Sequence, residues 1–139
     1  MIKYDNDNIF AKIIATEIPC ARVFEDDSFL VFMDVMPMSK GHCLVIPKAP
    51  SRNLLDADPS NLPSLIQLVQ KIAKATKKAM NADGIIIQQF NEESAGQTVF
   101  HLHFHIIPTY QGKKINRHAE KMSDFAELAN LAMQISEQL

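Results

Sequence analysis

The segment HLHFHIIP, residues 101–108, holds three of the chain's five histidines at alternate positions. A two-residue alternation of polar and apolar side chains is typical of a half-buried β-strand, because successive side chains point to opposite faces. One face would carry the imidazoles of His101, His103 and His105, and the other would carry Leu102, Phe104 and Ile106. Packing alone would not select three histidines for one face, so the row indicates a chemical role.

Three roles are open to this row. A zinc site is one, but strand residues two apart lie about 6.7 Å apart, so the row spans roughly 13 Å, while each ligand nitrogen must lie about 2.1 Å from the ion. Two imidazoles could share a metal with a distant residue, but three in a row could not. Packed, hydrogen-bonded histidines are a second role, at a desolvation cost. The third is catalysis on a phosphate, since neutral imidazole attacks phosphorus directly and leaves easily in a second step.

The N-terminal part of the chain is predicted to place one helix and three strands around these residues. The helix begins at the Asp and Asn residues of segment 5–8, which are capping types, and ends before Pro19. Strands are predicted at 21–25, 29–34 and 42–47, because these runs of β-forming residues are separated by segments of turn-forming residues.

The C-terminal part is predicted to contain two helices and two further strands. A long helix runs from Asn61 to Met80, a fourth strand follows Gly84, and Ser123 is the expected cap of a last helix. The predicted buried stripe of the long helix is Leu62, Leu65, Ile66, Val69, Ile72, Ala73 and Met80. That of the last helix is Phe125, Leu128, Ala132 and Ile135. Short connections between sequential strands favour antiparallel pairing, so the predicted class is α+β, with the long helix crossing one sheet face.

Composition excludes several classes of function. A chain of 139 residues is predicted to form a single domain, residues 1–139, and its net charge of −2 gives no general attraction to nucleic acid or anionic membranes. No apolar run approaches the roughly 20 residues that span a bilayer, and the N-terminus does not resemble a signal peptide. Cys20 and Cys43 are isolated, which suggests reduced thiols. We therefore expect a cytoplasmic protein with no nucleic-acid and no membrane partner.

Three segments together resemble the histidine triad (HIT) family of nucleotide hydrolases and transferases. They are GQTVFHLHFHIIP, FMDVMPMSKGHCLVIPK and NIFAKIIATEIP, and their order and spacing agree with the family pattern. The resemblance covers residues 8–110 and leaves 111–139 as a C-terminal extension with a helix. It implies a HIT-like fold, with an antiparallel sheet of about five strands, a long crossing helix and a homodimeric state.

The resemblance also implies roles for the histidines. His103 would attack the α-phosphorus of a nucleotide and form a covalent nucleotidyl-histidine intermediate, which water then hydrolyses. His105 would contact the phosphate, while His101 would join His42 in a network that moves protons and orients the nucleophile. Backbone N–H groups, a hydroxyl and imidazoles can meet the developing charge, so no metal or other cofactor is expected.

Further positions match the family's substrate-binding residues. Asp34 would bind the ribose, and Asn91, Gln97 and Thr98 would hold the phosphate and the leaving group. The base would lie among Ile9, Phe10, Phe32 and Val35. No hydrogen-bonding reader of a particular base is evident, so the expected ligand, a purine nucleotide or nucleotide conjugate, follows from the resemblance.

The sequence leaves the reaction itself open. The leading hypothesis is hydrolysis of nucleoside monophosphate conjugates such as phosphoramidates. A diadenosine polyphosphate hydrolase would differ only in the leaving group, and a nucleotide-binding or scaffold protein could retain the triad with little turnover.

One departure from the family concerns zinc. Some bacterial members hold a structural zinc with an N-terminal Cys-x-x-Cys pair, a histidine after the IPK strand and the first triad histidine. Here those positions are Asn8, Ala11, Pro50 and His101, so three of the four ligands are absent. Because structural zinc normally needs four protein ligands, the chain is predicted to fold without it. The first helix would instead be tied to the sheet by Ile9, Phe10 and Ile13.

Overall fold

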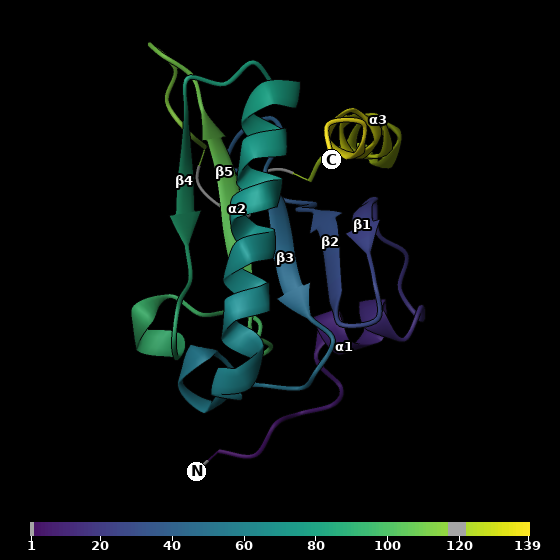
Figure 1. Ribbon diagram of the computed structural model, residues 1–139, viewed down its shortest axis with the longest axis vertical. Coiled ribbons are helices and arrows are strands. Elements are labelled where there is room, and N and C mark those ends of the chain that lie inside the picture. Colours follow the sequence, from purple (N-terminus) through teal and green to yellow (C-terminus); the bar gives the residue numbers. More distant parts are fainter. Residues whose placement is uncertain (1, 117–121) are drawn as a thin grey trace.

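A computed structural model describes residues 2–116 and 122–139 and shows an α+β fold (Figure 1). Its centre is one five-stranded antiparallel sheet with the strand order β1-β2-β3-β5-β4. The strands are β1 (Arg22–Glu25), β2 (Phe29–Met33), β3 (Cys43–Pro47), β4 (Gly84–Gln88) and β5 (Phe104–Thr109). The helices are α1 (Ile9–Ile14), α2 (Leu62–Ala79) and α3 (Phe125–Ser136). The predicted class, the five-stranded sheet and the long and C-terminal helices are confirmed.

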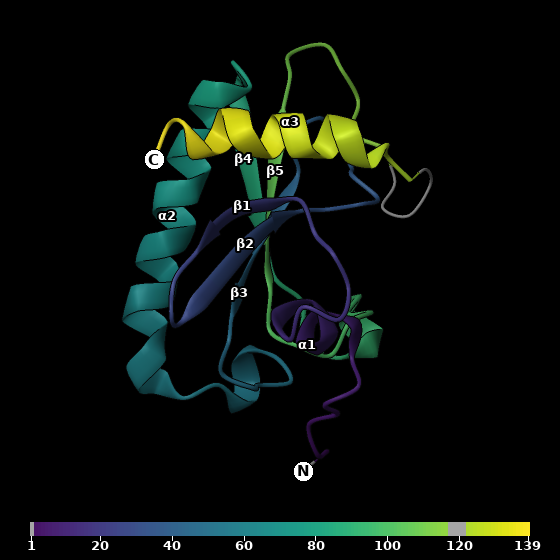
Figure 2. The same ribbon diagram turned by 90° about the vertical axis from the view of Figure 1, so that its right-hand side faces the viewer.

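The helices cover the sheet on both faces. Figure 2 shows α2 along one face, α1 against the other, and α3 lying across the end of the sheet near β1. Both faces of the central strands are therefore covered, and every residue of β2 and β3 is buried. Within the described residues, no helix combines the length and the apolar content needed to cross a membrane.

The larger hydrophobic core lies between the sheet, α2 and α3. The side of α2 that faces it carries Leu65, Leu68, Val69, Ile72, Ala75 and Thr76. The predicted stripe was wrong at Ile66, which is 52% exposed, because it lies on the flank of this arc. Phe125, at the first turn of α3, is also exposed rather than buried, and the α3 side chains that reach the core include Leu131.

A smaller core lies under α1 on the opposite face. It contains Phe10 of α1, with Leu30, Phe32, Leu44 and Ile46 from β2 and β3. Ile13 packs against this cluster, as predicted. Ile9 does not, since it is 46% exposed at the start of the helix.

The histidine segment differs from the predicted strand in two respects. β5 begins at Phe104, so only His105 lies in a strand, and His101 and His103 belong to an extended segment that precedes it. The prediction of a half-buried strand is also wrong for the histidine side, because all three imidazoles are buried. The reason is that α1 packs over that side of the segment, where Phe10 contacts the ring of His103. The alternation of residues does not predict this cover.

The turn before β3 places His42 and depends on Gly41. Gly41 has a φ of +96°, and a Cβ built on it would lie 2.5 Å from Cγ of Met80 and 3.1 Å from Cγ of Pro108. Gly112 also has a positive φ, of +77°, but nothing lies within 4 Å of its Cβ position. The two glycines thus share the backbone requirement and differ in the space available.

This pair gives a stability prediction. We expect Gly41→Ala to lower the free energy of unfolding by about 3 kcal/mol, because it adds overpacking to backbone strain, and Gly112→Ala to lower it by about 1 kcal/mol through strain alone. Urea unfolding of both variants measures the difference. Equal losses would show that Met80 and Pro108 impose no packing constraint on the turn.

Candidate active site

The four described histidines gather on the α1 side of the sheet. The β3–β5 register pairs Leu44 with His105, and His42, two residues before Leu44, lies beside His105 on that face. His103 and His105 line a cavity of about 180 Å³ together with Met38, Gln88, Phe90, Gly96 and Thr98. Two of the predicted triad residues, His103 and His105, therefore meet Thr98 at one cavity.

Hydrogen bonds to the backbone determine which nitrogen of His103 carries its proton. Nδ1 of His103 lies 2.7 Å from the carbonyl oxygen of His101, and a carbonyl can only accept, so Nδ1 is the protonated nitrogen. Nε2, on the opposite edge of the ring, is then the basic nitrogen. The ring is held further by an edge-to-face contact with Phe10, with centroids 4.9 Å apart. A neutral imidazole held in this way is suited to nucleophilic attack through Nε2.

The same reasoning orders the protons of His42 and His105. The backbone N–H of Met38 donates to Nδ1 of His42 at 3.0 Å, so His42 is protonated on Nε2. The Nε2–H of His42 in turn donates to Nδ1 of His105 at 2.9 Å. The proton of His105 is therefore on its Nε2. His105 thus presents a donor suited to an anionic oxygen. Oδ2 of Asp34 lies 3.4 Å from Nε2 of His42, where a carboxylate favours the protonated nitrogen.

The predicted network of His42 with His101 is not what the structure shows: His42 is hydrogen-bonded to His105, and His101 has other partners. Its Nε2 donates to the carbonyl oxygen of Pro47 at 2.7 Å, and its Nδ1 accepts from the hydroxyl of Tyr4 at 2.5 Å. Burial lowers the pKa of His101, which keeps the ring neutral. The sequence did not predict a role for Tyr4, because nothing in residues 1–8 indicates a contact with His101, 97 positions away.

The polar residues of segment 91–98 divide into two groups. Thr98 is exposed and lines the cavity, as does Gly96, whose φ of +105° suits glycine. Asn91 accepts from the backbone N–H of Leu54 at 3.0 Å and exchanges two hydrogen bonds with Gln89, which leaves one of its amide hydrogens outside these bonds. Gly96 and Thr98 can therefore meet a ligand directly, whereas Asn91 does not line the cavity.

Gln97 faces the other way. Its side chain is 1% exposed, and its amide group makes four hydrogen bonds. Oε1 accepts from the backbone N–H of Glu92 and from Nδ2 of Asn53, and Nε2 donates to the carbonyl oxygens of Arg52 and Val99. All its strong hydrogen-bonding positions are occupied, so the structure assigns this side chain to holding the segment together instead of to the predicted substrate contact.

The residues expected to hold the base and ribose lie around α1 and the end of β2. Phe10 and Phe32 are buried in edge-to-face contact with each other, with ring centroids 5.4 Å apart, whereas Ile9 and Val35 are each almost half exposed. None of the four lines the 180 Å³ cavity. Asp34 is buried and its Oδ1 accepts from the backbone N–H of Met36 at 2.8 Å. A base and ribose subsite at these residues remains a prediction.

One group of described residues has the composition of a metal site. Ligand atoms of Asp34, His42 and His105 all lie within 4.8 Å of one another. However, the N–H of Met38 occupies Nδ1 of His42, so the neutral ring keeps its proton on Nε2, the nitrogen that would have to bind the ion. Coordination of an ion by Nε2 would require the hydrogen bond from Met38 to break. The three residues are therefore better suited to a chain of hydrogen bonds than to binding a metal.

The positions of the zinc ligands in some bacterial HIT proteins are occupied here by a different network. Oδ1 of Asn8 accepts from the backbone N–H of Ala11 at 2.9 Å and caps α1. Nδ2 of Asn8 donates to the Tyr4 hydroxyl at 2.9 Å, and this hydroxyl is hydrogen-bonded to His101. Asn8 and Tyr4 thus connect α1 to the first histidine of the triad without a metal ligand.

Comparisons with known proteins agree with this architecture. Residues 15–112 match the HIT domain family. A Hit-like protein of Bartonella henselae, described as involved in cell-cycle regulation and solved with an unknown ligand, superposes with a TM-score of 0.92 at 53% identity, over 99% of this chain and 100% of the other. An uncharacterised HIT-like protein of Borreliella burgdorferi is 39% identical over 94% of this chain and 96% of its own length. Adenylylsulfatase HINT3 of Arabidopsis thaliana is 37% identical over 84% of this chain and 62% of its own length.

The network around His101 leads to a prediction about metal. We expect the purified protein to fold without zinc, because His101 is already hydrogen-bonded at both nitrogens and three of the usual ligands are replaced. Elemental analysis of protein purified without chelator, and unfolding curves with and without EDTA, provide the measurement. Stoichiometric zinc, or a large loss of stability in EDTA, would contradict the prediction.

Proposed function

Because the chain belongs to the histidine triad (HIT) family, we propose that it is a nucleotide hydrolase that cleaves nucleoside monophosphate conjugates at the α-phosphorus. The observation that carries the proposal is the hydrogen bond from Nδ1 of His103 to the carbonyl oxygen of His101, which leaves Nε2 as the nucleophile. Phosphoramidates of purine nucleosides are the proposed substrates. The cytoplasm is the proposed compartment.

The proposed reaction has two steps. In the first, the lone pair of Nε2 of His103 forms a bond to the α-phosphorus, and the leaving group departs with the electrons of its own bond and takes a proton from solvent. The positive charge that develops on the His103 ring is met by the carbonyl oxygen of His101. In the second, water attacks phosphorus, the bond to Nε2 breaks with return of its electrons to the ring, and the water's proton goes to solvent. The products are the nucleoside monophosphate and the free leaving group.

Other residues would stabilise the charge on the phosphoryl oxygens. His105 can donate from Nε2, and it is held in that tautomer by His42. Thr98 adds a hydroxyl at the same cavity, which would hold the phosphate in the ground state and the transition state alike. Donors placed in advance around a developing charge are typically the largest contribution to such catalysis. These groups supply it without a metal ion.

A substrate panel tests the proposal. It contains an adenosine phosphoramidate, diadenosine polyphosphates, nucleotide sugars and, because of the Arabidopsis relative's activity, adenylyl sulfate. Fastest turnover of the phosphoramidate supports the proposal, whereas fastest turnover of a diadenosine polyphosphate favours the alternative hydrolase. Binding of nucleotides without turnover, and without a labelled nucleotidyl-protein intermediate, would favour a nucleotide-binding or scaffold protein.

The role of His103 gives a mutational prediction. We expect His103→Ala to lower turnover at least about 10³-fold, because it removes the nucleophile, and to abolish the labelled intermediate. The fold should persist, because the side chain borders an existing cavity.

His105→Ala serves as the matched control, since it should slow turnover and still form the intermediate. Turnover, trapping of the intermediate and thermal unfolding are measured together. An active, labelled His103→Ala variant would eliminate His103 as the nucleophile.

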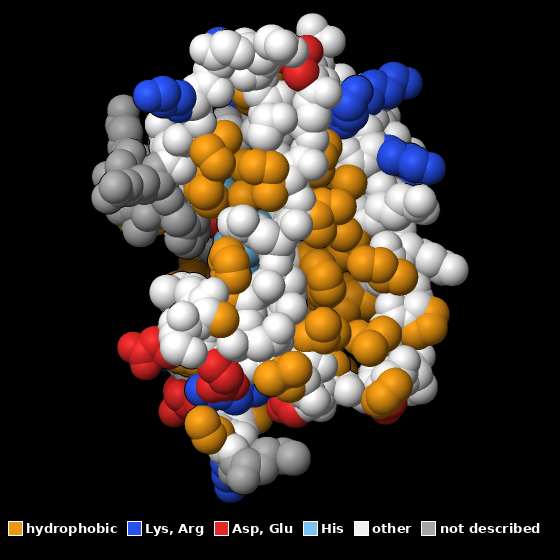
Figure 3. Space-filling model, turned by 90° about the vertical axis from the view of Figure 1, so that its left-hand side faces the viewer, with side chains coloured by type: hydrophobic (Ala, Val, Ile, Leu, Met, Phe, Trp, Pro, Cys, Tyr) orange, Lys and Arg blue, Asp and Glu red, His pale blue; other side chains and the backbone are white. Residues whose placement is uncertain are grey.

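We further propose that the protein is a homodimer, as the family resemblance implies. β4 is an edge strand of the sheet, and Ile87 on β4 and Ile66 on α2 are both about half exposed. Figure 3, viewed from the β4 side, shows apolar side chains gathered over a broad area of this face. It includes an apolar groove of about 520 Å³ lined by Leu54, Pro59, Leu62, Pro63, Leu65, Ile66 and Phe104. A second copy of the chain is the proposed occupant.

Light scattering tests the dimer. At micromolar concentration we expect twice the chain mass of 15.6 kDa, and we expect Ile66→Glu to give a monomer because it places a charge in the apolar contact. Met133→Glu, on the exposed side of α3, is the matched control and should remain dimeric. A monomer mass for the wild-type protein would reject the stable dimer.

A further inference from the structure

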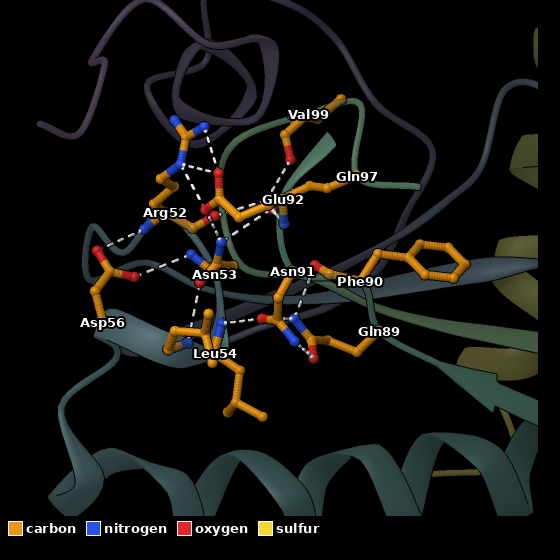
Figure 4. A network of polar contacts seen from close by, with 11 residues as sticks. Arg52, Asn53, Leu54, Asp56, Gln89, Phe90, Asn91, Glu92, Gln97 and Val99 are labelled. Atoms are coloured by element: carbon orange, nitrogen blue, oxygen red, sulfur yellow. Dashed lines mark hydrogen bonds and ion pairs between the residues drawn. The ribbon is translucent and has the colours of Figure 1, made fainter. Parts of the chain in front are cut away.

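The segment that lines the cavity is held from behind by a second segment. Residues 89–98 connect β4 to the histidine segment, and residues 51–56 follow β3. Figure 4 shows that side chains of both segments point toward each other and form one polar network. The second segment is itself attached to the triad, because the backbone N–H of Leu102 donates to the carbonyl oxygen of Ser51 at 2.9 Å. The network therefore couples the cavity wall to the histidines.

An ion pair lies at the centre of this network. The guanidinium of Arg52 donates to both carboxylate oxygens of Glu92, with Nε to Oε2 at 2.9 Å and Nη2 to Oε1 at 2.9 Å. These hydrogen bonds lower the pKa of Glu92, so the carboxylate is charged at neutral pH. The guanidinium also lies over the ring of Phe100, 4.1 Å from its centroid. A bidentate, stacked pair has a defined geometry that a loose surface pair lacks.

The backbone of Glu92 needs such a restraint. Its φ of 78° and ψ of 159° lie in a region that essentially only glycine occupies without strain. Its N–H donates to Oε1 of Gln97 at 2.8 Å, and its carbonyl oxygen accepts from the N–H groups of Ala95 and Gln97. A strained residue persists only where its surroundings over-determine it, and here both its side chain and its peptide groups are held.

Asn53 links the ion pair to Gln97. Its side-chain amide donates to Oε2 of Glu92 at 2.7 Å and to Oε1 of Gln97 at 3.0 Å. Asn53 and Gln97 are each 1% exposed. Since Gln97 immediately precedes Thr98, a shift of Glu92 would reach the cavity wall through a single buried side chain.

We propose that Arg52 and Glu92 are positioning residues that hold segment 91–98 in the shape that receives the nucleotide's phosphate. The proposal rests on the nucleotide hydrolase function. Neither side chain lines the cavity, so both act through the backbone of Gly96 and Thr98. Phosphate contacts of this kind are made equally in the ground state and the transition state. Loss of the ion pair should therefore raise KM and change kcat little.

The experiment compares variants of the full chain by three measurements. These are KM and kcat for an adenosine phosphoramidate, the Kd of adenosine 5′-monophosphate, and the thermal midpoint Tm. We expect Arg52→Met and Glu92→Ala to raise KM and Kd tenfold or more, with kcat within threefold of wild type. Glu92→Gly also removes the ion pair but accepts the positive φ, so its increase in Kd should be smaller than that of Glu92→Ala.

Arg22→Met is the matched control, because it removes an arginine from an exposed ion pair, Arg22–Glu25, that does not contact the segment. It should leave KM and Kd unchanged. Values within twofold of wild type for Arg52→Met and Glu92→Ala would overturn the proposal, even with a lowered Tm, because the pair would then serve stability alone. If these variants do not fold, Arg52→Lys and Glu92→Gln replace them, and failure of the milder pair to fold would also overturn it.

Amide hydrogen exchange of ligand-free protein separates this proposal from the function on which it rests. The N–H groups of Gly96 and Gln97 are bonded to carbonyl oxygens of Glu93 and Glu92, and their exchange should accelerate in Arg52→Met and Glu92→Ala but not in Arg22→Met. A wild-type protein that neither binds the monophosphate nor turns over any conjugate would reject the hydrolase function. Unchanged exchange in the variants would reject the positioning role whatever the activity.

Discussion

The structure depends on the burial of four imidazoles, none of which is more than 6% exposed. A buried imidazole needs an acceptor for its N–H and a donor for its other nitrogen, because an unpaired polar group in the interior is costly. Three of these partners are backbone groups from separate places: the carbonyl oxygen of Pro47, the N–H of Met38 and the carbonyl oxygen of His101. The tautomers of His42 and His105 therefore depend on the turn through Gly41 and on the β3–β5 register.

The two faces of the sheet differ in what they bury. One face carries the larger apolar core, and the other can therefore bury many polar side chains. The alternating residues of β2 send Val31 and Met33 into the core with α2 and α3, and Leu30 and Phe32 into the smaller core under α1. The first core is apolar and extensive, so most of the hydrophobic stabilisation lies on that side. The α1 side can then hold the histidines, Asp34 and their hydrogen bonds, although these contribute little net stability.

Local patterns in the sequence predicted most elements of the fold and the set of histidines, because both depend on short-range spacing. They failed where a contact is set by the sheet register or by distant segments. His42 pairs with His105 rather than His101 because β3 and β5 pair as they do, and Tyr4 reaches His101 across almost the whole chain. The exposure of Ile66 was missed for a similar reason. Helical periodicity predicts which side of α2 is buried, but packing against the sheet determines how wide the buried side is.

Gln97 and Thr98 show why a motif does not by itself identify contacts with a ligand. They are neighbours in the chain, yet the side chain of Gln97 lies in the polar network and Thr98 lines the cavity. Substitution of either would reduce activity, Thr98 through a lost hydrogen-bond donor and Gln97 through the shape of the segment. A loss of activity alone therefore cannot distinguish the two roles, whereas the direction of each side chain and the partners it already has can do so.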